Sequence, residues 1–178
     1  NCRSSGRRKR RRTRGPCLMR IIAQRVKEAS VSVDGRVVAA INTGIMALVA
    51  FGQEDGPEFR SKPAFTGMAR KLVGLRIFPG TGENAHKFHL SLDEIGGQIL
   101  FVPQFTLYAD CHKGRRPSFT DAGDPAWAKD MFTDFVQMVD ETCAVSVSSG
   151  IFGADMDVRL CNWGPVTIVL DSANLFSR

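Results

Sequence analysis

The chain has 178 residues, of which 43% are hydrophobic, and a formal net charge of +6. This length and composition are typical of one globular domain with a sizeable core. No apolar run approaches the roughly 18–20 residues of a transmembrane helix, which excludes a helical membrane protein and predicts a soluble, cytoplasmic one. Residues 1–18 hold eight basic side chains and no acidic one, so residues 19–178 carry 24 − 8 = 16 basic against 18 acidic side chains.

The sequence divides into a basic N-terminal tail, residues 1–18, and a single domain, residues 19–178. Clustered arginines attract phosphate groups without reading sequence, which suits a nucleic-acid-binding arm. A nuclear or transit address also fits this composition, and so does a disordered, solvated extension without a defined role. Met19 opens the first strand-like pattern and is a candidate for the functional start of the chain.

The cysteines and histidines predict neither disulfides nor a metal site. The five cysteines include no C-x-x-C pair, and their number is odd, which indicates reduced thiols in the cytosol. His86 and His89 form an H-x-x-H pattern without a third ligand nearby. We interpret this pattern as part of a polar hairpin, and we expect no metal and no cofactor.

The first part of the domain predicts a three-stranded meander. A β-like pattern runs through residues 20–33, and Asp34-Gly35 is a strong hairpin signal. Residues 37–41 form the returning strand. After a second turn at residues 42–44, residues 45–51 are all apolar, which favours a central strand.

Two main helices are predicted. Apolar side chains recur at helical spacing within residues 57–72, but Pro63 would interrupt that helix, so we expect it to begin there. Asp124 and Pro125 form the start of a second helix, as an N-cap followed by proline at the first helical position. We interpret the apolar stripe that follows as core packing: Trp127, Met131, Phe135, Met138 and Val139.

Four further strands complete the expected fold. They are a short strand at residues 75–78, a buried strand at 98–102, and two strands at 157–161 and 166–170. The sum is an α+β fold with antiparallel-rich β-sheets of about eight strands. We expect these to pack with the two main helices into a barrel-like or layered, sandwich-like domain.

Two short segments do not fit a purely structural interpretation. The first, Pro103-Gln104-Phe105-Thr106-Leu107, directly follows the buried strand. Proline cannot donate a ladder hydrogen bond, so strand pairing stops there or lies at an edge, and polar groups become available to a ligand. The alternative is a strand that bends at Pro103 and resumes at Phe105.

The second segment is Asn162 to Thr167, which contains Gly164-Pro165 between two strand patterns. Gly-Pro is a turn signal, yet no polar loop surrounds it. A bond before proline adopts the cis form at a cost of only about 0.5–1 kcal/mol, and glycine permits backbone angles that other residues avoid. The alternative is an ordinary hairpin turn.

Read together, Q-F-T-L at residues 104–107 and N-x-G-P-V-T at residues 162–167 resemble the paired signature motifs of D-aminoacyl-tRNA deacylases. The resemblance covers Met19 to Leu170 and leaves out the tail. Further matches occur in the family's order, at residues 23–26, 76–78, 96–97, 114–119 and 154–156.

The resemblance implies a homodimer that hydrolyses the ester of D-aminoacyl-tRNA, and of glycyl-tRNA mischarged on tRNA(Ala). Gly164-Pro165 of one subunit would enter the active site of the other, with a cis bond and both carbonyls facing the pocket. An L-amino acid would then push its side chain into these carbonyls, whereas a D-amino acid or glycine would not.

The same resemblance assigns roles to individual residues. Gln104, Phe105 and Thr106 are the candidate catalytic residues, with Gln104 fixing the strand end and backbone N–H groups near the other two holding the developing oxyanion. Arg25 would brace the partner's dipeptide. The remaining candidates for substrate binding and chiral selectivity are Gly164, Pro165, Pro103, Leu107, Val166 and Thr167.

The attacking group is expected to be water. A threonine nucleophile needs a general base, and no family motif surrounds His86, His89 or His112. The tRNA's own terminal 2′-hydroxyl, which the family's mechanism uses, would assist the water, and positioning would supply most of the remaining rate. A generic esterase or amidase with Thr106 as nucleophile is the rival enzyme class.

One departure from the family bears on specificity. The first motif usually begins with serine, where this chain has Pro103. A related animal group that edits other mischarged tRNAs has P-Q-A-T-L there, and is thought to hold its Gly-Pro bond trans with a roomier pocket. Phe105 and the G-P-V-T context resemble the D-specific enzyme, so a relaxed-specificity editing deacylase is the alternative.

A second alternative is a non-catalytic RNA- or DNA-binding module. It is suggested by the basic tail and by a cluster of cations at Lys113, Arg115 and Arg116. In the deacylase interpretation, the same three side chains are candidates for binding the acceptor end of tRNA, although a solvated loop has the same composition.

Overall fold

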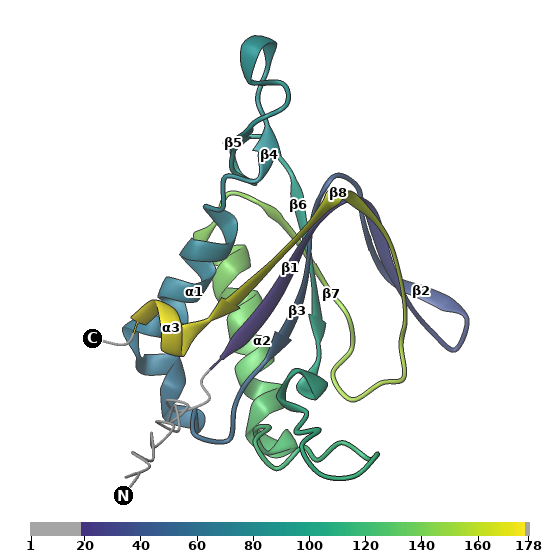
Figure 1. Cartoon of the computed structure of the whole chain (residues 1–178), viewed down its shortest axis with the longest axis vertical. Helices are drawn as coiled ribbons and strands as arrows, with labels where there is room; N and C mark the ends of the chain where they lie inside the picture. Colours follow the sequence, from purple (N-terminus) through teal and green to yellow (C-terminus); the bar gives the residue numbers. More distant parts are fainter. Residues whose placement is uncertain (1–18, 177–178) are drawn as a thin grey trace, which may run out of the picture.

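The computed structural model describes residues 19–176 (Figure 1). The predicted tail, residues 1–18, lies outside the described residues. The main sheet contains β1 (Arg20–Val33), β2 (Arg36–Ile41), β3 (Gly44–Ala50), β6 (Gln98–Pro103), β7 (Ser146–Ser149) and β8 (Asp157–Asp171). A separate hairpin pairs β4 (Phe78–Pro79) with β5 (Phe88–Leu90). The helices are η1 (Pro57–Ser61), α1 (Pro63–Val73), η2 (Gly82–Asn84), η3 (Phe105–Tyr108), α2 (Pro125–Thr142) and α3 (Ser172–Phe176).

The first three strands pair differently from the expected meander. The sheet order is β2-β1-β3-β6-β7, with β8 on the other side of β1. Strand β1 has 14 residues, against six in β2 and seven in β3. Both shorter strands therefore fit along the same side of β1, β3 against residues 20–26 and β2 against residues 29–33. All three pairings of β1 are antiparallel, whereas β6 pairs in parallel with β3 and β7.

The two predicted C-terminal strands are one strand. Strand β8 runs without a break from Asp157 to Asp171 and pairs with β1 along its length. A bulge at its centre interrupts the alternation of apolar residues. The prediction of two separate strands, at 157–161 and 166–170, was therefore wrong. Strand β4 likewise begins only at Phe78, within the expected strand at 75–78.

The predicted helix starts are confirmed. Helix α1 begins at Pro63, after Lys62 in an extended conformation, and residues 57–61 form a separate 3-10 turn. A residue before proline is sterically pushed out of the helical region, which explains the break. Helix α2 begins at Pro125, and the Asp124 side chain accepts a hydrogen bond from the Ala126 N–H at 2.8 Å.

Two hydrophobic clusters lie on opposite faces of the sheet. The larger is covered by α1 and α2, which lie side by side on one face (Figure 1). Its aromatic rings meet edge to face, as in Phe101 on Phe135 at 5.7 Å. The smaller cluster includes Met46 and Leu100 and lies on the opposite face of the sheet from the helices. Strand β3 is apolar throughout, and β6 is apolar after Gln98, because both faces of these strands are buried.

The ends of the molecule are occupied by different segments. In Figure 1, the β4–β5 hairpin forms one end, and the segment between β6 and α2 forms the opposite end. Among residues 19–176, no helix is both long enough and apolar enough to span a membrane.

Candidate functional site

A pocket of about 950 Å³ lies where the parallel strands β3 and β6 end. Four segments line it: residues 49–53 at and after the end of β3, residues 102–105 at and after the end of β6, residues 119–132 leading into and within α2, and residues 152–158 before and within β8. Within the described part of the chain, its lining includes two carboxylates, Asp124 and Asp155, but no histidine, cysteine, lysine or arginine. The pocket can bind a ligand through apolar walls and backbone groups, and its ionisable lining groups are carboxylates.

The predicted catalytic segment forms the turn η3 beside this pocket, and the strand does not resume at Phe105. The Gln104 N–H donates to the Val49 carbonyl at 2.8 Å, and the Leu107 N–H donates to the Gln104 carbonyl at 3.2 Å. The N–H groups of Phe105 and Thr106 belong to the first turn, where a helix offers no acceptor of its own. They are therefore suited to hold an oxygen of a ligand.

Only some of the residues predicted for catalysis and selectivity at 103–107 line the pocket. Pro103, Gln104 and Phe105 line the pocket, whereas Thr106 and Leu107 are outside its lining. Phe105 is 56% exposed, and its ring packs edge to face on Phe119 at 5.1 Å. The Thr106 hydroxyl accepts a hydrogen bond from Gln104 Nε2 at 2.6 Å. An amide donor cannot act as the general base that a threonine nucleophile requires.

The Gly-Pro segment forms a bulge in β8, not a hairpin turn. Opposite the single residue Arg25 of β1, strand β8 has four residues, 163–166, between the paired residues Asn162 and Thr167. The Gly164–Pro165 bond is cis, as expected, and both residues are exposed. Gly164 has a φ of 137°, a conformation that favours glycine.

Arg25 holds this bulge from inside the same chain. Its side chain is buried, at 7% exposure, and its Nε donates to the Trp163 carbonyl at 2.8 Å. Its Nη1 donates to the Ile77 carbonyl, and its guanidinium carbon lies 4.6 Å from the centre of the Trp163 ring. Burial lowers the pKa of Arg25, but arginine keeps its charge in proteins. Its contact with a partner's dipeptide stays a prediction.

Polar side chains fix the other flank of the bulge. Asn162 Oδ1 accepts a hydrogen bond from the Val166 N–H at 2.9 Å, and its amide nitrogen donates to the Thr167 hydroxyl at 3.2 Å. Gln24 Nε2 donates to the same hydroxyl at 3.3 Å. The two ends of the bulge are thereby tied to each other and to β1.

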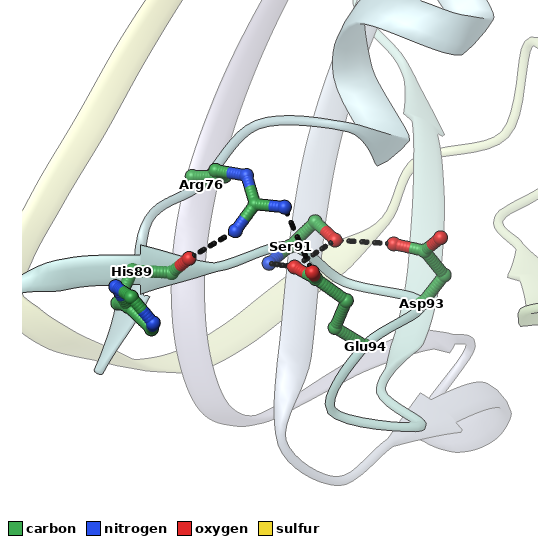
Figure 2. Close-up of polar contacts among 5 residues, drawn as sticks. All are labelled: Arg76, His89, Ser91, Asp93 and Glu94. Atoms are coloured by element: carbon green, nitrogen blue, oxygen red, sulfur yellow. Dashed lines mark hydrogen bonds and ion pairs between the residues drawn. The ribbon is translucent and has the colours of Figure 1, made fainter. Parts of the chain in front are cut away.

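A third group of contacts ties together the segments on either side of the β4–β5 hairpin (Figure 2). Arg76 donates to the His89 carbonyl at 2.6 Å and to Glu94 Oε1 at 2.8 Å. Ser91 donates its N–H and its hydroxyl to Glu94, each at 2.7 Å. These bonds lower the pKa of Glu94, with those from Ser91 contributing most. The network braces the hairpin whose Phe88 ring lies 5.5 Å from the Arg25 guanidinium.

The pocket and the bulge are far apart within one chain. Along β3, the residue paired with Arg25 is Ile45, and the residue paired with Pro103 is Val49. Four residues of strand span about 13 Å, and the three strand spacings from β8 to β6 add about 14 Å across the sheet. The predicted selectivity residues Gly164 and Pro165 therefore do not line the pocket of their own chain.

The predicted tRNA-binding cations lie on a closed loop beside the pocket. Lys113, Arg115 and Arg116 are all exposed. The loop is closed at its base by reciprocal backbone hydrogen bonds between Asp110 and Ser118, at 2.7 and 2.9 Å. The loop begins directly after η3 and ends at Phe119, which lines the pocket.

One buried ionisable residue that the sequence did not indicate is Asp55, which follows the pocket-lining residues Phe51 and Gln53. It is fully buried, and its Oδ2 accepts a hydrogen bond from the Gly52 N–H at 2.7 Å. Burial raises the pKa of Asp55 to about 7, against the opposing effect of the N–H groups of Gly52 and Met19. Trp127 and Phe152 also line the pocket, and only their three-dimensional placement shows it.

The geometry first defines a class. This is an α+β protein with an apolar pocket at the carboxyl ends of parallel strands, a polar turn at its edge and a separate, rigidly held, exposed dipeptide. Residues 22–171 match the family model described as D-Tyr-tRNA(Tyr) deacylase. The chain belongs to this family.

Individual relatives agree with the family match. The chain is 77% identical to the D-aminoacyl-tRNA deacylase of Desulfovibrio desulfuricans over 89% of its own length and 99% of that protein. It is 52% identical to the D-aminoacyl-tRNA deacylase of Solidesulfovibrio magneticus, over 88% and 98% of the two chains.

Two solved structures share the fold. One, named c-Myc DNA Unwinding Element Binding Protein, has a TM-score of 0.75 and 34% identity, over 85% of this chain and 97% of that one. The other, described as a probable eukaryotic D-amino acid tRNA deacylase, has a TM-score of 0.72 and 21% identity, over 86% and 98%. At that identity, the second likeness speaks for the fold alone.

Proposed function

We propose that this protein is an ester hydrolase that releases D-amino acids from D-aminoacyl-tRNA in the cytoplasm. The observation that carries the proposal is the turn at residues 104–107, set at the edge of an apolar pocket in a chain that matches the deacylase family over residues 22–171. A pocket of about 950 Å³ is large enough for an aminoacyl group and the terminal nucleoside of tRNA.

The chemistry needs no side-chain nucleophile. Water adds to the ester carbonyl carbon, the bond between that carbon and the ribose 3′-oxygen breaks, and the 3′-oxygen takes up a proton. The neighbouring 2′-hydroxyl relays a proton from the water, and the N–H groups of Phe105 and Thr106 hold the oxyanion. Two features support this route. The pocket lining among residues 19–176 contains no histidine, and the Thr106 hydroxyl accepts a hydrogen bond from the side-chain amide of Gln104.

Chiral selection is assigned to Gly164-Pro165 of a second subunit. The dipeptide is exposed, is held by Arg25 and Asn162, and lies too far from the pocket of its own chain to line it. Nearby apolar side chains are also exposed, among them Phe88 at 58% and Val169 at 64%, which suits a homodimer interface. A rigid pair of partner carbonyls would exclude an L-side chain and admit D-amino acids and glycine.

Recognition of tRNA is assigned to the pocket mouth. Exposed aromatic rings such as Phe105 offer a stacking surface for an unpaired base. Lys113, Arg115 and Arg116 lie on the loop next to it and would neutralise phosphates of the acceptor end. These contacts position the ester and carry no information on chirality.

The test is deacylation of one amino acid attached to the same tRNA in its D- and L-forms, together with glycyl-tRNA(Ala). We expect the D-ester and the glycyl ester to be cleaved, and the L-ester at least about 100-fold more slowly. Comparable cleavage of D and L would instead favour the relaxed-specificity editing enzyme suggested by Pro103. Absence of cleavage of all three would contradict the hydrolase.

Nucleic-acid binding without catalysis is the second candidate, favoured by the exposed cations at 113–116. It is separated from the first by removing residues 1–18 and measuring both tRNA binding and deacylation. A chain that never deacylates, and loses tRNA binding with these residues, is a binding module. A shortened chain that still deacylates contradicts that interpretation.

A further inference from the structure

Arg20 connects three distant segments at the pocket end of the molecule. It is the first residue of β1, and its Nη1 donates to the Leu107 carbonyl of η3 at 3.1 Å. Its Nε donates to Asp171 Oδ2, at the end of β8, at 3.0 Å. Its guanidinium carbon also lies 4.7 Å from the centre of the buried Tyr108 ring. One side chain thus joins β1, β8 and the turn that carries Phe105 and Thr106.

The ion pair between Arg20 and Asp171 is partly buried and fixed on both sides. The two side chains are 25% and 15% exposed. Arg20 and Asp171 stand directly opposite each other in the β1–β8 ladder. Asp171 Oδ1 also accepts a hydrogen bond from the Ala173 N–H at 2.9 Å, so the carboxylate cannot turn away. A planar guanidinium held in this way has its remaining donors aimed in a set direction.

Arg20 completes a clamp on η3. The N-terminal side of the turn is held by the hydrogen bond from the Gln104 N–H to the Val49 carbonyl at 2.8 Å. Its C-terminal side is held by Arg20 at the Leu107 carbonyl. The N–H groups of Phe105 and Thr106 lie between these two anchors, so their direction depends on both.

We infer that Arg20 is a positioning residue for ester hydrolysis, an inference that rests on the proposed function. It acts through η3 and does not touch the substrate. Without it, the C-terminal half of the turn loses its anchor, and the oxyanion donors move relative to the ester carbonyl. Misplacement by about 1 Å is enough to cost roughly 100-fold in rate.

The test compares Arg20→Met with Arg60→Met. Arg60 forms an ion pair of similar length with Asp134, at 2.7 Å, but it joins η1 to α2 and does not touch η3. We expect Arg20→Met to lower kcat on D-aminoacyl-tRNA by about 10- to 100-fold, with KM within about 3-fold of wild type, because only the reacting geometry changes. Arg60→Met should leave both constants within about 2-fold.

Conservative variants separate positioning from folding. Arg20→Lys can donate to the Leu107 carbonyl but lacks the planar fork, so we expect it to restore part of kcat. The double variant Arg20→Met/Asp171→Asn should be no slower than Arg20→Met, because Asp171 acts on the turn through Arg20. If Arg20→Met does not fold, the kcat of Arg20→Lys relative to that of wild type tests the inference.

Two results overturn the inference. One is a folded Arg20→Met, or Arg20→Lys where Met does not fold, with kcat equal to wild type. The other is a loss that vanishes when the variant is assayed well below its own melting temperature. Wild-type cleavage of D-aminoacyl-tRNA is the separate readout of the proposed function: its absence overturns the function and this inference together, whereas an active wild type with an equally active variant overturns the inference alone.

Discussion

The η3 turn and the β8 bulge are built by different kinds of bonds, although both present backbone groups to a ligand. The turn is held at its backbone, by the Val49 carbonyl at one end and by Arg20 at the Leu107 carbonyl at the other, and its Phe105 ring remains 56% exposed. The bulge is held by side chains that converge from β1 and from the hairpin, chiefly the buried Arg25. Gly164 and Pro165 are left exposed at the apex.

This difference follows from what each region is proposed to do. A turn that holds a developing oxyanion needs N–H groups in a fixed direction, and 3-10 backbone geometry supplies that direction at its first turn. A dipeptide that excludes one enantiomer must resist displacement by a bulky side chain, which demands support from several directions. We therefore expect changes in the bulge to have larger effects on selectivity than changes of side chain in the turn.

The largest effect is expected from Gly164→Ala. An added Cβ would lie 2.8 Å from Arg25 Nη2 and 2.8 Å from Val166 Cγ2, at a φ of 137°. The guanidinium cannot yield, since it is bonded to the Trp163 and Ile77 carbonyls. We expect D-aminoacyl-tRNA turnover to fall about 100-fold as the dipeptide shifts, with a reduced ratio of D to L cleavage. Deacylation of both enantiomers measures this.

Gly35→Ala is the matched control. Gly35 also has a positive φ, 74°, but no atom lies within 4 Å of an added Cβ, and it belongs to the distant β1–β2 turn. It should cost about 1 kcal/mol of stability from backbone strain and leave the D to L ratio unchanged. If Gly164→Ala kept the wild-type ratio of D to L cleavage, the Gly164-Pro165 dipeptide would not be the chiral filter.

Sequence patterns predicted the regular strands and helices of this fold better than they predicted the turn and the bulge. Patterns of apolar residues identified β1, β3 and β6, because each buries one or two continuous faces, whereas β2 was identified from the Asp34-Gly35 turn before it. The starts of α1 and α2 were predictable from Pro63 and from the Asp124-Pro125 pair, since capping and proline geometry are local. The cis Gly164–Pro165 bond was expected from the resemblance and is present, whereas the η3 turn at 105–108 and the bulge at 163–166 were not predicted.

The errors come from contacts that sequence patterns do not contain. Strand β8 was divided because the four residues opposite Arg25 break its alternation. The order β2-β1-β3 depends on the length of β1, and the pocket assembles four segments that are remote in sequence. In the sequence, Arg20 is an ordinary strand residue and Asp55 an ordinary loop residue. Only the structure shows the hydrogen bonds of Arg20 to Leu107 and of Asp55 to Gly52.

A smaller effect is expected from Thr106→Ala. The variant loses one hydrogen bond, from Gln104 Nε2 at 2.6 Å, while the backbone N–H of residue 106 remains. A loss of about 0.5–1.5 kcal/mol corresponds to at most roughly a 10-fold lower kcat. Single-turnover deacylation of D-aminoacyl-tRNA measures it, with Thr106→Ser as a control that keeps the hydroxyl. Suppose that Thr106→Ala folds and binds substrate but shows no turnover, while Thr106→Ser is active. That result would favour Thr106 as the nucleophile.

The smallest effect on activity, but a clear one on stability, is expected from Asp55→Asn. Because burial raises the pKa of Asp55 to about 7, the folded chain binds a proton that the unfolded chain has lost between about pH 4 and pH 7. This group therefore makes the free energy of unfolding fall as pH rises through that window, by up to about 1.4 kcal/mol per pH unit, and then level off above it.

Asparagine cannot titrate, yet it keeps an oxygen for the Gly52 N–H, which donates to Asp55 Oδ2 at 2.7 Å. Asp55→Asn should flatten this part of the stability curve and gain stability relative to wild type at pH 8. Urea unfolding at constant ionic strength from pH 5 to pH 8 measures the slope. An equal slope in both proteins would show that Asp55 holds no additional proton in the folded chain over this range and would contradict its raised pKa.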